Sequence, residues 1–138
     1  MYILDTNVVS ELRKSKRGRA DARVVAWADA MPTTNMFLSV ITVLELEQGI
    51  LLVERRDQRQ GRALREWFVS SVLPAFSDRI FPVDEPVARV CAGLHVPDPR
   101  GERDALIAAT AIVHGMTVVT RNVVDFEPIG VCLLNPWT

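Results

Sequence analysis

The chain has 138 residues, a length that suits one domain, and 49% of them are hydrophobic, which is enough for a buried core. With 16 basic and 17 acidic residues its net charge is -1, so overall basicity does not indicate a nucleic-acid partner. No apolar run reaches the roughly 18 residues of a membrane helix, and the first residues lack the pattern of a secretory signal. We therefore expect a single cytoplasmic domain over residues 1–138 without membrane contact.

Short apolar runs alternate with longer segments of helical periodicity along the chain. Strands are expected at residues 2–4, 35–40, 79–83, 116–120 and 130–135. Helices are expected at residues 7–13, 20–31, 41–56, 57–73, 85–96 and 102–115. This order favours an α/β fold in which a mostly parallel central sheet is covered by helices on both faces.

Polar side chains follow two of the expected strands at the point where each strand ends. Asp5 comes directly after the first strand. Arg121 and Asn122 come directly after the strand at 116–120, and Asp125 follows three residues later. Ligands of an open parallel sheet bind just beyond the carboxyl ends of its strands. The two strand ends would therefore present oxygen ligands at the same edge of the sheet.

Other acids have two interpretations each. Glu45 and Glu47 lie in a helix that is otherwise almost entirely apolar, where a buried carboxylate is costly unless it is paired or bound to metal. Periodicity does not show which of the two is buried. Asp104 lies in the first turn of its helix, where it could simply offset the helix dipole by about 0.3–1 kcal/mol. Asp5, or either of the two residues after it, could cap the next helix.

Four segments, taken in order, resemble the PIN-domain family. They are LDTNVVSEL at 4–12, LSVITVLELEQGI at 38–50, GERDALIAATAIVHGMTVVTRNVVDFE at 101–127 and NPW at 135–137. They are most similar to the VapC-type ribonuclease toxins of type II toxin–antitoxin systems and to the FitB-like subgroup. The resemblance extends over the whole chain, and it implies a PIN-like three-layer α/β/α sandwich with a mostly parallel central sheet.

The resemblance also implies a set of acidic site residues. It selects Glu45, in its T-x-x-E-L setting, over Glu47. Asp5, Glu45 and Asp104 would then be the catalytic acids. Asp5 and Asp104 are the expected direct metal ligands, and Glu45 and Asp125 are further candidate ligands.

The fourth position of the site departs from the family pattern. Many members have an acid directly after the T-R pair, whereas this sequence has Asn122 there. Asp125 either compensates as a ligand or serves as a turn residue. We expect Asn122, Thr6, Thr120 and Arg121 to position the metal or the substrate, although each hydroxyl could equally cap a helix or end a strand.

The chemistry follows from these ligand types. Two carboxylates about 4 Å apart repel by about 4 kcal/mol at an effective dielectric constant near 20, so a cluster of them needs a cation or raised pKa values. An all-oxygen cluster suits Mg²⁺ or Mn²⁺ and does not suit zinc. Such an ion polarises a phosphodiester and lowers the pKa of a bound water. The expected activity is metal-dependent hydrolysis of RNA, with one or two metal ions.

A basic stretch after the first helix is a candidate RNA contact. It contributes five side chains, Arg13, Lys14, Lys16, Arg17 and Arg19. They could hold phosphates without reading bases, or they could be an ordinary solvated surface. A second group of arginines over residues 55–65 is interleaved with acids at helical spacing, which favours surface ion pairs.

Membership of the toxin family would imply protein partners as well as a nuclease activity. It implies a homodimer that is neutralised by a cognate antitoxin protein, with a higher-order toxin–antitoxin complex on DNA. An alternative is a weakly catalytic or non-catalytic PIN-fold protein whose main role lies in a DNA-bound autoregulatory complex. The amide of Asn122, in place of an acid, is the feature that supports the alternative.

Overall fold

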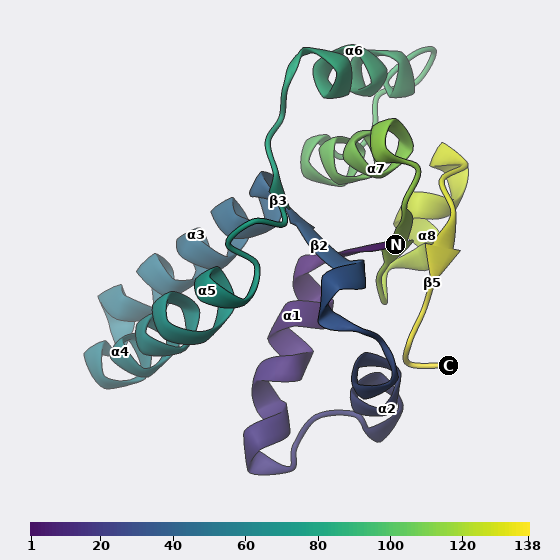
Figure 1. Ribbon diagram of the computed structural model, residues 1–138. Helices are drawn as coiled ribbons and strands as arrows, with labels where there is room; N and C mark the ends of the chain where they lie inside the picture. The colour runs from purple at the N-terminus through teal and green to yellow at the C-terminus, as the bar shows by residue number, and fades with distance from the viewer.

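Five short strands form one sheet in the computed structural model, which describes residues 1–138 (Figure 1). The strands are β1 (Tyr2–Leu4), β2 (Met36–Ser39), β3 (Ile80–Phe81), β4 (Thr117–Val119) and β5 (Leu133–Leu134). Their order across the sheet is β3-β2-β1-β4-β5, and every pairing is parallel. The expected parallel sheet is therefore confirmed, and the first strand of the chain lies at its centre.

Helical segments connect the strands, because parallel neighbours cannot be joined by a tight turn. They are α1 (Thr6–Arg13), η1 (Lys14–Arg17), α2 (Ala22–Ala30), η2 (Thr33–Asn35), α3 (Val40–Arg56), α4 (Gln58–Trp67), η3 (Phe68–Val72), α5 (Leu73–Ala75), α6 (Glu85–Leu94), α7 (Glu102–His114), α8 (Val123–Phe126) and η4 (Glu127–Ile129). None of these helices combines the length and the apolar character that crossing a membrane requires.

Neighbouring residues of the central strands enter different cores, since side chains alternate between the two faces of a strand. Leu4 and Val119 pack with residues of α1, α2 and α3. Ile3 and Val118 pack mainly with residues of α7 and α8. Figure 1 shows these two helical layers on either side of the strands. The protein is therefore the three-layer α/β/α sandwich that the resemblance implies.

Helix α6 lies outside α7 and does not reach the sheet (Figure 1). Val87 and Cys91 of α6 pack against Ala105 and Ala109 of α7. The small alanine side chains allow the two helices to approach closely. The first turn of α7, which carries Asp104, is therefore held from the outside by α6.

Helices α3 and α4 run side by side as a hairpin that extends away from the sheet (Figure 1). Gly61 makes their close approach possible, because a Cβ atom at this position would lie 2.7 Å from the Cα atom of Glu54. Any other residue would push the two helices apart. The hairpin brings side chains of α4 within reach of the acids on α3.

The segment expected to be a helix over 57–73 is helical, but its geometry changes along its length. Helix α4 ends at Trp67, and a π-helical turn, η3, separates it from the short α5. In this wider turn the Leu73 amide donates to the carbonyl of Phe68. Pro74 follows directly, and its ring removes an amide donor and crowds the preceding turn of a regular helix. The wide turn therefore coincides with the proline.

Candidate active site at the sheet edge

Asp5 stands at the carboxyl end of the central strand. Its amide donates to the Val119 carbonyl at 2.9 Å, so the strand pairing continues as far as this residue. Its Oδ1 accepts the Thr6 amide at 2.8 Å, which makes Asp5 itself the N-cap of α1. Asp5 is buried, with 5% of the residue exposed, and this burial raises the pKa of its carboxyl group, whereas the hydrogen bonds from Thr120 and Thr6 lower it. Asp5 therefore both caps the helix and faces the site.

Thr120 and Asn7 fix the second oxygen of this carboxylate. The Thr120 hydroxyl donates to Oδ2 of Asp5 at 2.8 Å, and the Asn7 amide group donates to the same oxygen at 3.3 Å. Thr120 also accepts the Asn122 backbone amide at 2.9 Å, and Asn7 accepts that of Arg121 at 3.3 Å. These bonds join the ends of β1 and β4. The sequence indicates Asn7 only as a possible helix cap, and no local pattern signals its part in this link.

Glu45 and Glu47 leave α3 in different directions. Oε1 of Glu45 accepts the hydroxyl of Thr6 at 2.7 Å, which places Glu45 beside Asp5. Glu47 instead pairs with Arg65 of α4 at 2.7 Å, and this arginine lowers the pKa of Glu47. Glu45 is therefore the acid of α3 that lies at the sheet edge, and Glu47 belongs to the helical hairpin.

Asp104 completes the group of acids from the first turn of α7. Its pKa is raised to about 6, first by burial and then by the negative charges of Asp5, Asp125 and Glu45. Asp125 comes from the first turn of α8, where it is exposed. Three other carboxylates thus act electrostatically on Asp104, and we call Asp5, Glu45, Asp104 and Asp125 the acidic cluster.

The other two strand-end residues contact the site less directly. Asn122 is exposed, and its backbone carbonyl accepts the Asp125 amide at 3.1 Å. Arg121 is exposed and its guanidinium lies over the ring of Trp137, 5.4 Å from the ring centroid. The side chain of Arg121 therefore packs against the C-terminal segment, and no ion pair links it to the acidic cluster.

The acidic cluster suits a divalent cation by the chemistry of its donors. It offers carboxylate oxygens, which Mg²⁺ and Mn²⁺ prefer. The negative charges of Asp5, Asp125 and Glu45 contribute, after burial, to the raised pKa of Asp104. One basic side chain, Arg103, approaches the cluster, with Nη1 3.8 Å from Oε2 of Glu45. A bound cation would remove the repulsion that the fold leaves in place.

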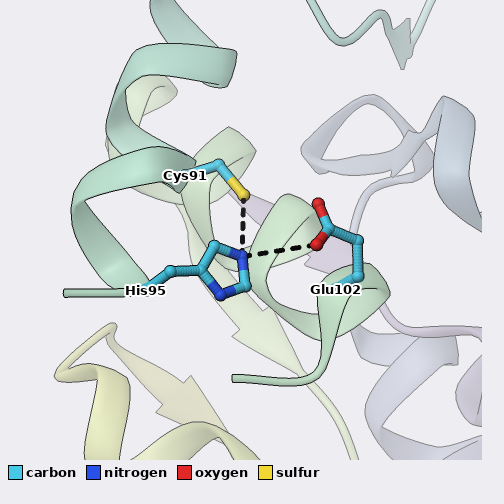
Figure 2. Close-up of side chains that lie close together, drawn as sticks. All are labelled: Cys91, His95 and Glu102. Atoms are coloured by element: carbon cyan, nitrogen blue, oxygen red, sulfur yellow. Dashed lines mark hydrogen bonds and ion pairs between the residues drawn. The ribbon is translucent and has the colours of Figure 1, made fainter. Parts of the chain in front are cut away.

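A second cluster of metal-capable side chains lies between α6 and α7 (Figure 2). The Nε2 atom of His95 lies 3.8 Å from Sγ of Cys91 and 3.6 Å from Oε2 of Glu102. The Nδ1 atom of the ring accepts the Arg100 amide at 3.0 Å. In the neutral ring the proton is therefore on Nε2, which cannot then bind a metal. We call Cys91, His95 and Glu102 the His95 junction, and its geometry fits hydrogen bonding.

The basic stretch of the sequence divides into different environments. Arg13 lines a pocket of about 250 Å³ together with Thr6 and Glu45, next to the acidic cluster. Lys16 and Arg17 share a neighbouring pocket of about 160 Å³ with Arg13. The other two basic residues of the stretch point elsewhere: Lys14 pairs with Glu11, and Arg19 is exposed.

The chain matches the PIN domain over residues 2–127. It is 39% identical to "Toxin FitB" of Neisseria gonorrhoeae and 40% identical to "VapC ribonuclease Y4jK" of Sinorhizobium fredii, with at least 98% of each chain covered. The crystal structure of FitAcB from Neisseria gonorrhoeae superimposes with a TM-score of 0.88 at 39% identity, over 99% of both chains. The structure of FitAB bound to an IR36 DNA fragment also gives 0.88, at 38% identity, over 100% of this chain and 96% of that one. The chain belongs to the PIN-domain family.

Proposed function

We propose that this protein is a metal-dependent endoribonuclease, the toxin of a type II toxin–antitoxin pair that acts in the cytoplasm. The observation that carries the proposal is the acidic cluster, in which four carboxylates meet at the carboxyl edge of a parallel sheet. Full-length relatives named as a toxin and as a VapC ribonuclease support the same activity. Phosphodiester hydrolysis is the chemistry that such a cluster serves.

Asp5 and Asp104 are the proposed direct ligands of Mg²⁺ or Mn²⁺, with Glu45 and Asp125 completing the site. The bound ion would polarise the scissile phosphodiester and lower the pKa of the attacking water. The chain's own contribution is to fix the carboxylates before substrate arrives. Asp5 is held by three donors and Glu45 by the Thr6 hydroxyl, so little reorganisation is needed on binding.

Asn122 has a structural part in this proposal. Its backbone amide bonds the Thr120 hydroxyl, which in turn holds the Asp5 carboxylate. Residue 122 thus helps to hold Asp5 through its backbone amide, and this contact does not depend on the side chain at that position. Asp125, which is three residues further on, supplies a carboxylate near Asp104. The replacement of an acid by Asn122 therefore leaves the cluster with four carboxylates.

The pockets beside the acidic cluster are the proposed binding path of the RNA backbone. Arg13 belongs to both pockets, and Lys16 and Arg17 continue from it away from Glu45. We propose that these three side chains hold backbone phosphates, while Lys14 and Arg19 add to the local positive charge. Contacts of this kind position RNA and do not read its bases.

A cognate antitoxin and a second copy of the chain are the proposed protein partners. The relative solved as FitAB bound to an IR36 DNA fragment supports a higher-order complex on DNA. The same complex favours a second candidate function, in which this chain is a weakly catalytic or non-catalytic member of an autoregulatory assembly. Cleavage of RNA by the purified chain distinguishes the two functions.

The test compares two glutamates on the same helix. Purified protein is incubated with cellular RNA in Mg²⁺, in Mn²⁺ and in EDTA. We expect cleavage only with metal, and a loss of at least about 100-fold in Asp5→Asn, Asp104→Asn and Glu45→Gln. Glu47→Gln, the matched control, should keep activity within about twofold, because Glu47 pairs with Arg65 away from the site. A wild-type protein that cleaves no RNA in either metal would leave the assembly role as the function.

A further inference from the structure

Arg103 is the only basic side chain within ion-pair distance of the acidic cluster. It directly precedes Asp104 in the first turn of α7, and its Nη1 approaches Oε2 of Glu45. One guanidinium, paired with Glu45 alone, stands against four carboxylates, so the cluster keeps an excess of negative charge. Any anion that enters the site, such as an RNA phosphate, meets this repulsion and this single cation.

The contact between Arg103 and Glu45 is loose. Its 3.8 Å separation exceeds the roughly 2.7–2.9 Å of a charge-assisted hydrogen bond. On the same helix α3, Glu47 lies 2.7 Å from Arg65, which is 29% exposed, whereas Arg103 is 46% exposed. Most of the donors of Arg103 are thus available to another anion.

Glu45 does not depend on Arg103 for its position. Its other carboxylate oxygen, Oε1, accepts the Thr6 hydroxyl at 2.7 Å. Glu45 would therefore stay at the sheet edge if Arg103 turned away. A divalent cation bound at Glu45 would compete with Arg103 for its negative charge and would weaken the attraction between the two side chains.

We propose that Arg103 is a substrate-binding residue that holds an RNA phosphate at the acidic cluster and pairs with Glu45 when neither metal nor RNA is bound. A guanidinium suits this role because its planar donors match two phosphate oxygens at once. The inference rests on the proposed ribonuclease function, to which it adds the residue that receives the phosphate. In the resting protein the same side chain acts as an internal competitor of the metal.

The first experiment measures metal affinity without RNA. Arg103→Gln and Arg103→Lys are titrated with Mn²⁺ by calorimetry beside the wild type. We expect Arg103→Gln to bind Mn²⁺ about threefold to tenfold more tightly, and Arg103→Lys to lie between the two. The control is Arg89→Gln, since Arg89 is 80% exposed on α6 and its removal makes the same change in net charge. A merely structural role for Arg103 would leave the affinity unchanged or weaken it.

The second experiment measures RNA binding apart from hydrolysis. A labelled oligoribonucleotide is bound to Asp5→Asn protein in millimolar Mg²⁺ and followed by fluorescence anisotropy. Adding Arg103→Gln should weaken binding about tenfold, adding Arg103→Lys should recover part of the loss, and adding Arg89→Gln should change little. In the wild-type background Arg103→Gln should lower kcat/KM at least tenfold although it binds metal more tightly.

The two experiments test the role of Arg103 separately from the proposed ribonuclease function. If Arg103→Gln binds Mn²⁺ no more tightly, the pairing with Glu45 is not a competitor of the metal and the inference fails. Unchanged RNA binding overturns the phosphate contact, whatever happens to metal affinity. If the wild type cleaves no RNA but both shifts occur, the ribonuclease function fails while Arg103 stands as a phosphate-binding residue.

Discussion

The acidic cluster and the His95 junction both gather side chains that bind metals elsewhere, but their internal chemistry is opposite. In the His95 junction donors face acceptors: the ring accepts the Arg100 amide and presents its own N–H to Cys91 and Glu102 (Figure 2). In the acidic cluster like charges face one another, and they add to the burial that raises the pKa of Asp104 to about 6. Both nitrogens of the His95 ring therefore have partners, whereas the acidic cluster keeps an excess of negative charge.

Proximity alone therefore does not identify a metal site. The three ligand atoms of the His95 junction all lie within 4.8 Å of one another, which makes it the tighter group. The hydrogen bond from the Arg100 amide already uses Nδ1 of His95, which leaves the N–H on Nε2, the ring atom that faces Cys91 and Glu102. The acidic cluster is more open, as mutually repelling carboxylates should be, and a cation would lower its energy. We therefore place the proposed metal site at the acidic cluster and not at the His95 junction.

The largest expected effect tests which cluster holds the metal. Asp5→Asn should lower Mn²⁺ affinity about 100-fold, since even the loss of a hydrogen-bond partner of a ligand costs roughly 10–100-fold. His95→Ala should leave that affinity within about twofold. Isothermal calorimetry with both variants makes the comparison. Co²⁺ titration adds a spectroscopic check, because a thiolate-to-cobalt absorption that disappears in Cys91→Ala would mean that the His95 junction does bind metal.

The next effect concerns stability. His95→Ala should lower the free energy of unfolding by about 2 kcal/mol, because the Arg100 amide loses its acceptor and buried contacts are lost. Urea unfolding followed by circular dichroism measures the change. Ser10→Ala, at a half-buried position of α1 away from the junction, serves as the control and should change little. A loss below about 0.5 kcal/mol would show that the junction is a passive contact.

Metal affinity should also depend on pH through Asp104. With a pKa of about 6 the carboxyl is mostly ionised at pH 7 and mostly protonated at pH 5. A proton must then leave before a cation binds, so Mn²⁺ affinity should fall about tenfold between pH 7 and pH 5. Titrations at the two pH values test this, and the fall should be nearly absent in Asp104→Asn. A flat pH profile in the wild type would argue against Asp104 as a ligand.

The smallest expected effect is a gain in stability. Because the pKa of Asp104 in the folded protein lies above its unfolded value of 3.8, folding is favoured at low pH and this contribution is lost as pH rises through 6. Asp104→Asn should therefore stabilise the metal-free protein at pH 7 by about 1 kcal/mol, a figure reduced for solvent screening of a half-buried group. The gain should be roughly half as large at pH 5 and should vanish only below pH 3.8, where the carboxyl is protonated in the unfolded chain as well. Asp78→Asn, at an exposed position, should show no such difference between the two pH values.

The sequence predicts the sheet and strand ends that carry the site better than the side-chain contacts within the site. Alternation of apolar strands with helices gives the parallel sheet, and a parallel sheet places Asp5 and the residues after β4 at one edge. Local pattern could not separate Glu45 from Glu47, because both lie on one apolar helix. What separates them is tertiary: Arg65 of α4 reaches Glu47, and Thr6 of α1 reaches Glu45.

The His95 junction and Arg103 illustrate what periodicity leaves out. The junction depends on how α6 packs against α7 and on the path of the connection between them, which sets Arg100 against the His95 ring. In the sequence Arg103 is one more charged residue in the first turn of a helix. Only the fold shows that Glu45 of α3 lies beside it. In both places the deciding contact joins elements whose spacing in sequence carries no signal.

The bond between Thr120 and Asp5 joins residues 115 positions apart, across the central strands of the sheet. During synthesis Asp5 leaves the ribosome early, but its partners on β4 follow about 6–23 s later at roughly 5–20 residues per second. The proposed nuclease centre cannot assemble before then. A growing chain that lacks β4 would therefore lack the proposed site, and a partner protein made beforehand would have that interval in which to bind it.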